Sequence, residues 1–219
     1  MTESGILPYD PVEAIQVLSR ADPRMGALIH SAGPYEINFR PAQDLFEALC
    51  ESIVYQQLSG KAAATIFDRF QSLFPGTDPP DPNLVLRAGT HRLRSVGLSG
   101  AKTTAIQDLA DKTLAGLVPT SDTIHDMSDD EISTRLTSVR GIGPWTVQML
   151  LIFRLGRPDI MPSTDLGIRK GFGLVYGWDA LPPPRHIMEH SERWIPYRSV
   201  ASWYLWRAFD IKGFTPGPI

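Results

Sequence analysis

A glycine-rich turn followed by a proline constrains the fold of this chain more than any other segment does. The turn spans residues 139–144 and reads VRGIGP, and an apolar stretch with helical spacing follows it. Glycine adopts positive φ angles at little cost, so Gly141 and Gly143 allow another backbone to approach closely. Pro144 suits the first position of a helix, where a missing N–H costs nothing. The unpaired amides of that helix start would bind an anion, and a phosphate is a suitable one.

Helical periodicity accounts for most of the remaining chain. Apolar residues recur at helical spacing in about ten or more segments, and no segment shows a convincing strand pattern. We therefore predict an all-α fold of two lobes. One lobe covers residues 42–160 and ends in the glycine turn and its two helices, and the other combines residues 1–41 with residues 161–219.

Local capping patterns place several of the helix starts. Asp10-Pro11 and Asp22-Pro23 each pair a capping aspartate with a proline in the first turn. Ser128 begins a capping box, which predicts the first helix of the hairpin. Ser59 is the predicted cap of another helix, and Pro196 is the predicted start of the last one.

The composition is that of an ordinary globular protein. The chain has 219 residues, of which 42% are hydrophobic and 21% charged, and its apolar runs are too short to span a membrane. The N-terminus lacks a basic region followed by an apolar stretch, so we expect a cytoplasmic protein without a secretory signal. The single cysteine, Cys50, excludes an internal disulfide and any four-cysteine zinc or iron–sulfur site. A net charge of −3 requires the basic groups to gather on one face if the partner is DNA.

The chain contains a further turn whose lysine has two interpretations. Gly97 makes a tight entry into a predicted helix, Ser99 caps that helix, and Lys102 lies in its first turn. A lysine is unfavourable near a helix N-terminus unless an anion lies nearby. Lys102 is therefore either a phosphate contact or a solvated residue on a surface turn.

The glycine turn and a later aspartate together carry a family resemblance. Residues 139–146 read VRGIGPWT and residues 162–165 read PSTD. This pattern resembles the helix-hairpin-helix DNA glycosylases, and within them the alkylation-repair branch of the 3-methyladenine DNA glycosylase II type. Weaker matches at 53–59 and 194–206 extend the resemblance over roughly residues 40 to 212. A glycine turn alone occurs in many DNA-binding proteins, whereas the turn and the aspartate at this spacing are specific.

The resemblance implies that Asp165 is the catalytic residue. Asp165 precedes a predicted helix, where the plain interpretation of an aspartate is an N-cap. The two roles are compatible, because the amides of a helix start stabilise a carboxylate. Breaking the bond between a base and deoxyribose builds an oxocarbenium-like sugar, which a carboxylate stabilises. A carboxylate also orients or deprotonates the attacking water, and the residues leave open which role dominates.

Trp145 indicates which reaction subtype the resemblance implies. Relatives that also cut the DNA strand carry a lysine here that forms a Schiff base, and an indole cannot be that nucleophile. We therefore expect a monofunctional enzyme that leaves an abasic site. The expected base pocket consists of Trp145, Trp206 and Tyr55, since electron-rich rings attract a positively charged methylated purine by ~0.5–2 kcal/mol. The alternative for Trp145 is a core position on its helix.

The resemblance also implies DNA contacts and an ion site. Gln56 or Gln57 would enter the minor groove as a wedge that fills the gap left by a flipped base, although an ordinary polar turn between two helices is the alternative. A sodium or potassium ion would bind the backbone oxygens of Thr137, Val139 and Ile142. We expect no cofactor for catalysis and no iron–sulfur cluster. The other predicted DNA-binding residues are Gly97, Ser99, Lys102, Gly141, Gly143 and Thr146.

These features predict a base-excision repair DNA glycosylase. It would flip alkylated purines such as 3-methyladenine or 7-methylguanine out of double-stranded DNA, into a cleft between the lobes, and hydrolyse the N-glycosidic bond. We expect a monomer associated with the nucleoid and no membrane partner. Two alternatives remain open: a glycosylase for deaminated or oxidised bases, and a non-catalytic helix-hairpin-helix DNA-binding protein.

Overall fold

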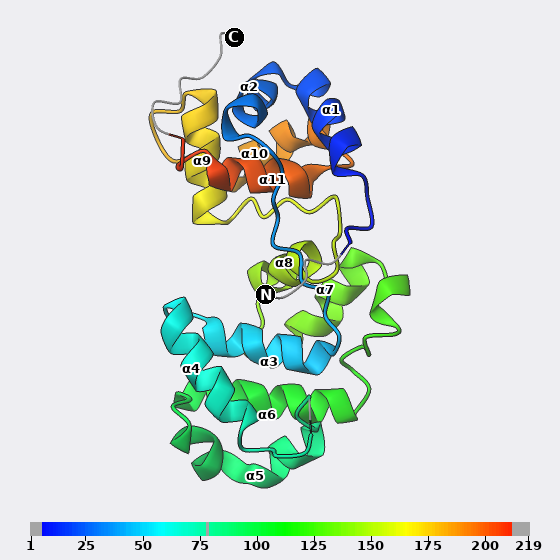
Figure 1. Ribbon diagram of the computed structural model, residues 1–219, viewed down its shortest axis with the longest axis vertical. Coiled ribbons are helices and arrows are strands. Elements are labelled where there is room, and N and C mark those ends of the chain that lie inside the picture. The colour runs from blue at the N-terminus through cyan, green and yellow to red at the C-terminus, as the bar shows by residue number, and fades with distance from the viewer. Residues whose placement is uncertain (1–5, 78, 212–219) are drawn as a thin grey trace. The chain divides into compact units, whose positions relative to one another are not determined.

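The computed structural model describes residues 6–77 and 79–211 of the chain. These residues form eleven α-helices and two short 3₁₀ helices, and no strand occurs among them (Figure 1). The predicted all-α class is therefore confirmed. Of the helices in these two ranges, none is both long and apolar enough to cross a membrane.

The helices belong to two compact units, and α8 (Pro144–Phe153) crosses the boundary between them. We call residues 42–147 the hairpin unit, and residues 1–41 with 148–219 the terminal unit. The other helices of the hairpin unit are α3 (Leu45–Tyr55), α4 (Gly60–Gln71), α5 (Pro82–Ser95), α6 (Gly100–Leu114), η1 (Ile124–Asp126) and α7 (Asp129–Thr137). Those of the terminal unit are α1 (Pro11–Ala21), α2 (Pro23–Ala32), α9 (Leu166–Tyr176), α10 (Pro184–Ser191), η2 (Glu192–Trp194) and α11 (Arg198–Arg207).

The boundary between the units lies after Val147, whereas the sequence prediction placed a lobe boundary after residue 160. The segment that follows α8 belongs to the terminal unit because its polar groups bind α11. Asp159 forms a bidentate ion pair with Arg198, with N–O distances of 2.7 and 2.9 Å. The Ile160 N–H donates to Ser199 Oγ at 2.9 Å.

The hairpin unit packs around α3. Asp44 starts this helix by accepting the Glu47 N–H at 2.7 Å. Its apolar stripe, which includes Leu49 and Ile53, is buried where α3 lies against α4 and α6, and α5 runs beside α6 (Figure 1). Each buried side chain of this size stabilises the fold by about 1.5–3 kcal/mol, so this stripe contributes substantially to the stability of the unit.

The terminal unit joins both ends of the chain in one core. α2 packs on α9 and α11, so the blue and the red ends of the ribbon meet in this unit (Figure 1). Trp194 and Tyr204 are fully buried there. α9 and α11 approach to backbone contact, because a Cβ added to Gly171 would lie 2.1 Å from the carbonyl oxygen of Leu205. Gly171 thereby allows α9 to pack directly on α11.

Most of the predicted helix starts are confirmed. The side chains of Asp10, Asp22 and Ser128 accept backbone N–H groups at the starts of α1, α2 and α7. Ser59 occupies the N-cap position of α4, but its side chain makes no capping hydrogen bond. The prediction for Pro196 was wrong, since α11 begins at Arg198. A turn closed by the Tyr197 N–H and the Trp194 carbonyl (2.7 Å) occupies the positions before it.

Candidate functional site

Asp165 is the N-cap of α9, as its position in the sequence indicated. Its Oδ1 accepts the backbone N–H of Ile168 at 2.8 Å. The same oxygen accepts the indole Nε1–H of Trp206 at 2.9 Å. The carboxylate therefore lies at the positive end of the α9 dipole and is held in one orientation by donors from two helices.

The position of Trp206 depends on its neighbours in the terminal unit. Its ring stacks on Phe153, with centroids 5.8 Å apart and planes at 29°. Gly167 makes room for the indole, since a Cβ there would lie 2.8 Å from Trp206 Cδ1 and 3.0 Å from Asp165 Oδ1. The sequence prediction made Trp206 a wall of the base pocket and missed its hydrogen bond to Asp165. A glycine two residues after a candidate catalytic aspartate was the available signal for close packing at that point.

The glycine turn connects α7 to α8 as predicted. Val139 and Ile142 are buried, and the Ile142 N–H donates to the Val139 carbonyl at 3.1 Å. Gly141 has a φ of +80°, and a Cβ on it would lie 3.0 Å from the Cβ of Ala105. Gly143 does not have a positive φ, and a Cβ built on it would meet no atom within 4 Å apart from its own chain neighbours. Only the first glycine is therefore required by the turn itself.

The structure distinguishes the two glutamines of the α3–α4 turn. Gln56 Nε2 donates to the Gly141 carbonyl at 2.9 Å and lies 3.5 Å from Thr146 Oγ1. Gln57 instead adopts a left-handed backbone with a φ of 57°, and it is exposed. A residue other than glycine adopts this backbone region at a conformational cost, so Gln57 is an uncommon residue at this position of a turn. The side chain of Gln56 thus joins this turn to the glycine turn.

Lys102 binds the end of another helix within the protein. Ser99 caps α6 by accepting the Lys102 backbone N–H at 3.3 Å, and Gly97 has a φ of +105°. The ammonium of Lys102 donates to the carbonyls of Val54 and Gln56 at 2.7 and 2.8 Å. Burial lowers the pKa of Lys102 from its usual value. Two of its three donors are therefore engaged at the end of α3, which neither interpretation of the sequence anticipated.

The remaining predicted residues of the hairpin unit lie close to these turns in the chain. Trp145, in the first turn of α8, has 46% of its surface exposed, so the core alternative for this residue is wrong. Tyr55 is the last residue of α3 and is half-buried. The hydrogen bonds of Gln56 and Lys102 bring the end of α3, the start of α6 and the glycine turn together. Asp165 and Trp206 meet in the terminal unit.

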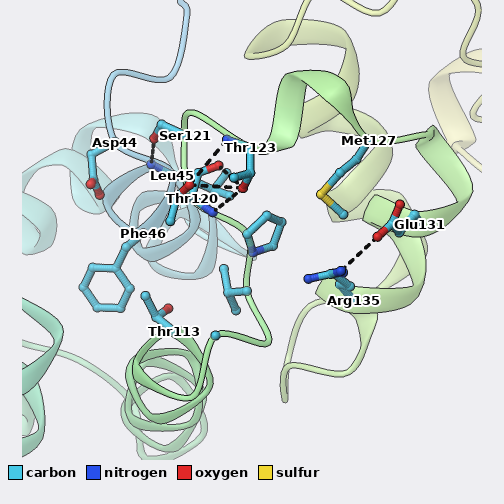
Figure 2. Close-up of a pocket in the computed structure, with 13 residues that line it drawn as sticks. Asp44, Leu45, Phe46, Thr113, Thr120, Ser121, Thr123, Met127, Glu131 and Arg135 are labelled. Carbon is cyan, nitrogen blue, oxygen red and sulfur yellow. Dashed lines mark hydrogen bonds and ion pairs between the residues drawn. The ribbon is translucent and has the colours of Figure 1, made fainter.

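A pocket of about 480 Å³ in the hairpin unit is formed by other residues. It lies between the start of α3, the end of α6 and α7, where Leu45 donates its N–H to Ser121 Oγ at 2.9 Å and Arg135 pairs with Glu131 at 2.9 Å (Figure 2). None of the residues predicted to contact DNA or the base lines it. This pocket therefore gives no support to the predicted site.

Asp22, predicted from the sequence only as a helix cap, is also a buried hydrogen-bond acceptor in the terminal unit. Asp22, only 3% exposed, caps α2 through Oδ1 and accepts three more donors through Oδ2: Tyr176 Oη at 2.8 Å, His190 Nε2 at 2.9 Å and Trp194 Nε1 at 3.1 Å. Burial alone would raise the pKa of Asp22, but these hydrogen bonds and that of the Met25 N–H hold it well below its usual range. His190 is thus one of the hydrogen-bond donors that hold the Asp22 carboxylate.

The chain matches a known protein family in sequence. The model of the HhH-GPD superfamily base excision DNA repair protein matches residues 50–197, which include the glycine turn and Asp165. DNA-3-methyladenine glycosylase 1 of Schizosaccharomyces pombe is 36% identical over 183 residues, which cover 81% of this chain and 80% of that protein. The alkylbase DNA glycosidase-like protein mag2 of the same organism is 29% identical, over 87% of this chain and 90% of its own.

A solved structure shares the fold as well. The Schizosaccharomyces pombe 3-methyladenine DNA glycosylase in complex with abasic DNA superimposes with a TM-score of 0.80 and 34% identity, and the match covers 93% of this chain and 99% of that one. Three observations point to the same family. They are the helical hairpin, the aspartate that caps the helix after it, and the match over most of the chain. The chain therefore belongs to the HhH-GPD superfamily of base excision DNA repair proteins.

Proposed function

We propose that this protein is a monofunctional DNA glycosylase that excises alkylated purines from double-stranded DNA. The main observation behind this proposal is Asp165, a carboxylate that two N–H donors hold at the start of α9. A relative that shares 36% of its matched residues is named a DNA-3-methyladenine glycosylase, and a similar structure was solved with abasic DNA. Both support damaged DNA as the substrate.

The proposed reaction replaces the bond between the purine nitrogen and C1′ of the sugar with a bond between C1′ and a water oxygen. The electron pair of the broken bond leaves with the base and neutralises the positive charge of an alkylated purine, so the leaving group needs no proton. Asp165 stabilises the positive charge that develops on the sugar and orients or accepts a proton from the attacking water. Because Trp145 supplies no amine, no Schiff base forms and the strand remains uncut at an abasic site.

Gly143 supports the proposed phosphate contact of the hairpin. The glycine at 141 is explained by its positive φ and by its contact with Ala105, whereas the glycine at 143 is explained by neither. The open space around Gly143, next to the first turn of α8, suits a phosphate that approaches the backbone amides. Such a contact holds the strand and carries no sequence information.

We assign the wedge to Gln57, because the side chain of Gln56 is engaged by Gly141. Flipping the damaged nucleotide out of the duplex costs a few kcal/mol for unstacking. Gln57 would then fill the gap that the nucleotide leaves. Trp145 and Tyr55, with Trp206, remain the proposed aromatic contacts of the base. The half-exposed ring of Trp145 supports such a role.

The carbonyl oxygens of Thr137, Val139 and Ile142 remain the proposed site of a sodium or potassium ion. Val139 O accepts one hydrogen bond from the Ile142 N–H, and a carbonyl oxygen has a second lone pair for a cation. An ion there would add positive charge next to a DNA phosphate. We further propose that the protein acts as a monomer on DNA in the nucleoid.

Gly143→Ala is expected to weaken DNA binding without weakening the fold. The added methyl group would occupy the surface proposed for the phosphate. We therefore expect the Kd for a duplex with an abasic-site analogue to rise about tenfold, a loss of about 1.4 kcal/mol in the free energy of binding. The melting temperature should stay unchanged, because the new Cβ meets no atom within 4 Å apart from its own chain neighbours. Gly60→Ala, at an equally open glycine that starts α4, is the matched control. Equal affinities of the two variants would contradict the assigned contact.

Release of free base tests the proposed function directly. The full chain is incubated with duplexes that contain 3-methyladenine, 7-methylguanine, hypoxanthine or uracil, and the released bases are separated by chromatography. We expect release of the two methylated purines, and strand breaks only after heat or alkali. Release of hypoxanthine or uracil alone would point to a glycosylase for deaminated bases. Binding of all duplexes without release would point to a DNA-binding protein that lacks the chemistry.

A further inference from the structure

Two charged side chains of α6 hold the backbone of the glycine turn. Asp108 Oδ2 accepts the backbone N–H of Arg140 at 2.7 Å. The same oxygen pairs with Lys112 Nζ at 2.9 Å, and Lys112 Nζ also donates to the backbone carbonyl of Ser138. One carboxylate and one ammonium thus bind an N–H and a C=O that lie two residues apart in the turn.

Packing and charge both support this contact. Ala105, Asp108 and Lys112 occupy positions i, i+3 and i+7 of α6, which share one face of a helix. Ala105 supplies the close apolar contact with Gly141 on that face. Burial raises the pKa of Asp108, but the Arg140 N–H and Lys112 outweigh it and hold the pKa below its usual value. The carboxylate is therefore ionised at neutral pH, as the contact requires.

The same helix also binds the turn that carries the proposed wedge. Lys102, in the first turn of α6, donates to the carbonyls of Val54 and Gln56. Gln56 in turn donates to the carbonyl of Gly141. The end of α3, the glycine turn and α6 therefore form a closed set of hydrogen bonds within the hairpin unit.

We propose that Asp108 and Lys112 are positioning residues for DNA binding, which hold the glycine turn in the conformation that receives a phosphate. The inference rests on the proposed function, since it assumes that the turn binds DNA. Its physical basis is preorganisation: a turn already ordered in the free protein loses less conformational entropy when the ligand binds. The N–H of Arg140 and the C=O of Ser138 both have partners on α6, so the ordered turn leaves neither group unpaired.

Substitutions of Asp108 separate a positioning role from a general structural one. Asp108→Ala removes the acceptor, so we expect the KM for damaged duplex and the Kd for an abasic-site analogue to rise about tenfold, while kcat at saturating DNA changes less than about twofold. Asp108→Asn keeps an oxygen that accepts the Arg140 N–H, so it should restore most of the affinity. Asp111→Ala, at an exposed aspartate of the same helix, is the matched control and should behave as wild type.

Amide hydrogen exchange of Arg140 gives a second readout that does not depend on DNA. We expect faster exchange in Asp108→Ala and slow exchange in Asp108→Asn, because the amide loses its acceptor only in the first. Exchange that speeds up while KM and Kd stay equal to those of Asp111→Ala would overturn the inference and leave the proposed function standing. A wild-type protein that fails to bind any duplex would overturn the proposed function and this inference together. Melting temperatures show whether any loss of affinity reflects unfolding.

Discussion

Asp165→Asn is expected to reduce the release of methylated purines by at least about 100-fold and to leave the fold intact. The amide oxygen of asparagine can accept the same two hydrogen bonds, from the Ile168 N–H and the Trp206 indole. Asparagine is also as good an N-cap as aspartate. The substitution therefore removes the negative charge while it can keep these two hydrogen bonds, and the developing charge on the sugar loses its stabilisation. Single-turnover release from methylated duplex measures the effect.

Two comparisons make the Asp165 result specific. Asp179→Asn, at an exposed position of the same unit, should leave base release and melting temperature unchanged. Binding of an abasic-site analogue by Asp165→Asn should stay near that of wild type, because the phosphate contacts are assigned to other residues. Base release within about threefold of wild type would show that this carboxylate does not stabilise the transition state.

Asp22→Asn is expected to lower the free energy of unfolding by about 3–5 kcal/mol. The buried carboxylate accepts hydrogen bonds from the Tyr176 hydroxyl, His190 and the Trp194 indole through Oδ2. An amide that keeps its oxygen at the α2 cap would present an NH₂ group to these donors and leave them unsatisfied. Asp10→Asn, at the exposed cap of α1, is the matched control and should cost less than about 0.5 kcal/mol. Equal urea midpoints for the two variants would contradict this assignment.

The pH dependence of stability follows from the same aspartate. The folded state holds the pKa of Asp22 below that of the unfolded chain, so the unfolded state binds the proton more readily. This contribution to stability is fully present above the unfolded value of about 3.9 and is lost as the pH falls toward the lower folded value. We expect the stability of wild type to fall more steeply below about pH 4 than that of Asp22→Asn. Urea unfolding of both proteins between pH 7 and pH 3 would measure the difference.

Local sequence signals were reliable where the structure they describe is itself local. The caps at Asp10, Asp22, Ser128 and Asp165 bind amides two or three residues away, so their residue types and spacing were sufficient. Pro196 failed as a helix start because a turn at Trp194–Tyr197 precedes α11, and a proline fits such a turn as well as a helix.

The role of one predicted site residue could be found from local sequence, whereas the contacts of others depend on the folded structure. Asp165 could be found from the sequence because a glycine hairpin followed by an aspartate is a specific pattern. The difference between Gln56 and Gln57 could not, since it arises from a hydrogen bond to Gly141, which lies 85 residues further along the chain. Lys102 likewise fits a surface residue or a phosphate contact by sequence, and only folding places its ammonium at the end of α3.

By itself the sequence determined the all-helical class, the helical hairpin, the aspartate at the start of α9 and the membership of the family. Each follows from periodicity, capping or a short motif, which act within a few residues along the chain. Only the tertiary structure decided that Trp206 binds Asp165, that Asp108 and Lys112 hold the glycine turn, and that Asp22 is a buried acceptor. Their partners lie 26 to 172 residues apart in the sequence, so these contacts exist only because helix packing brings the side chains within hydrogen-bonding distance.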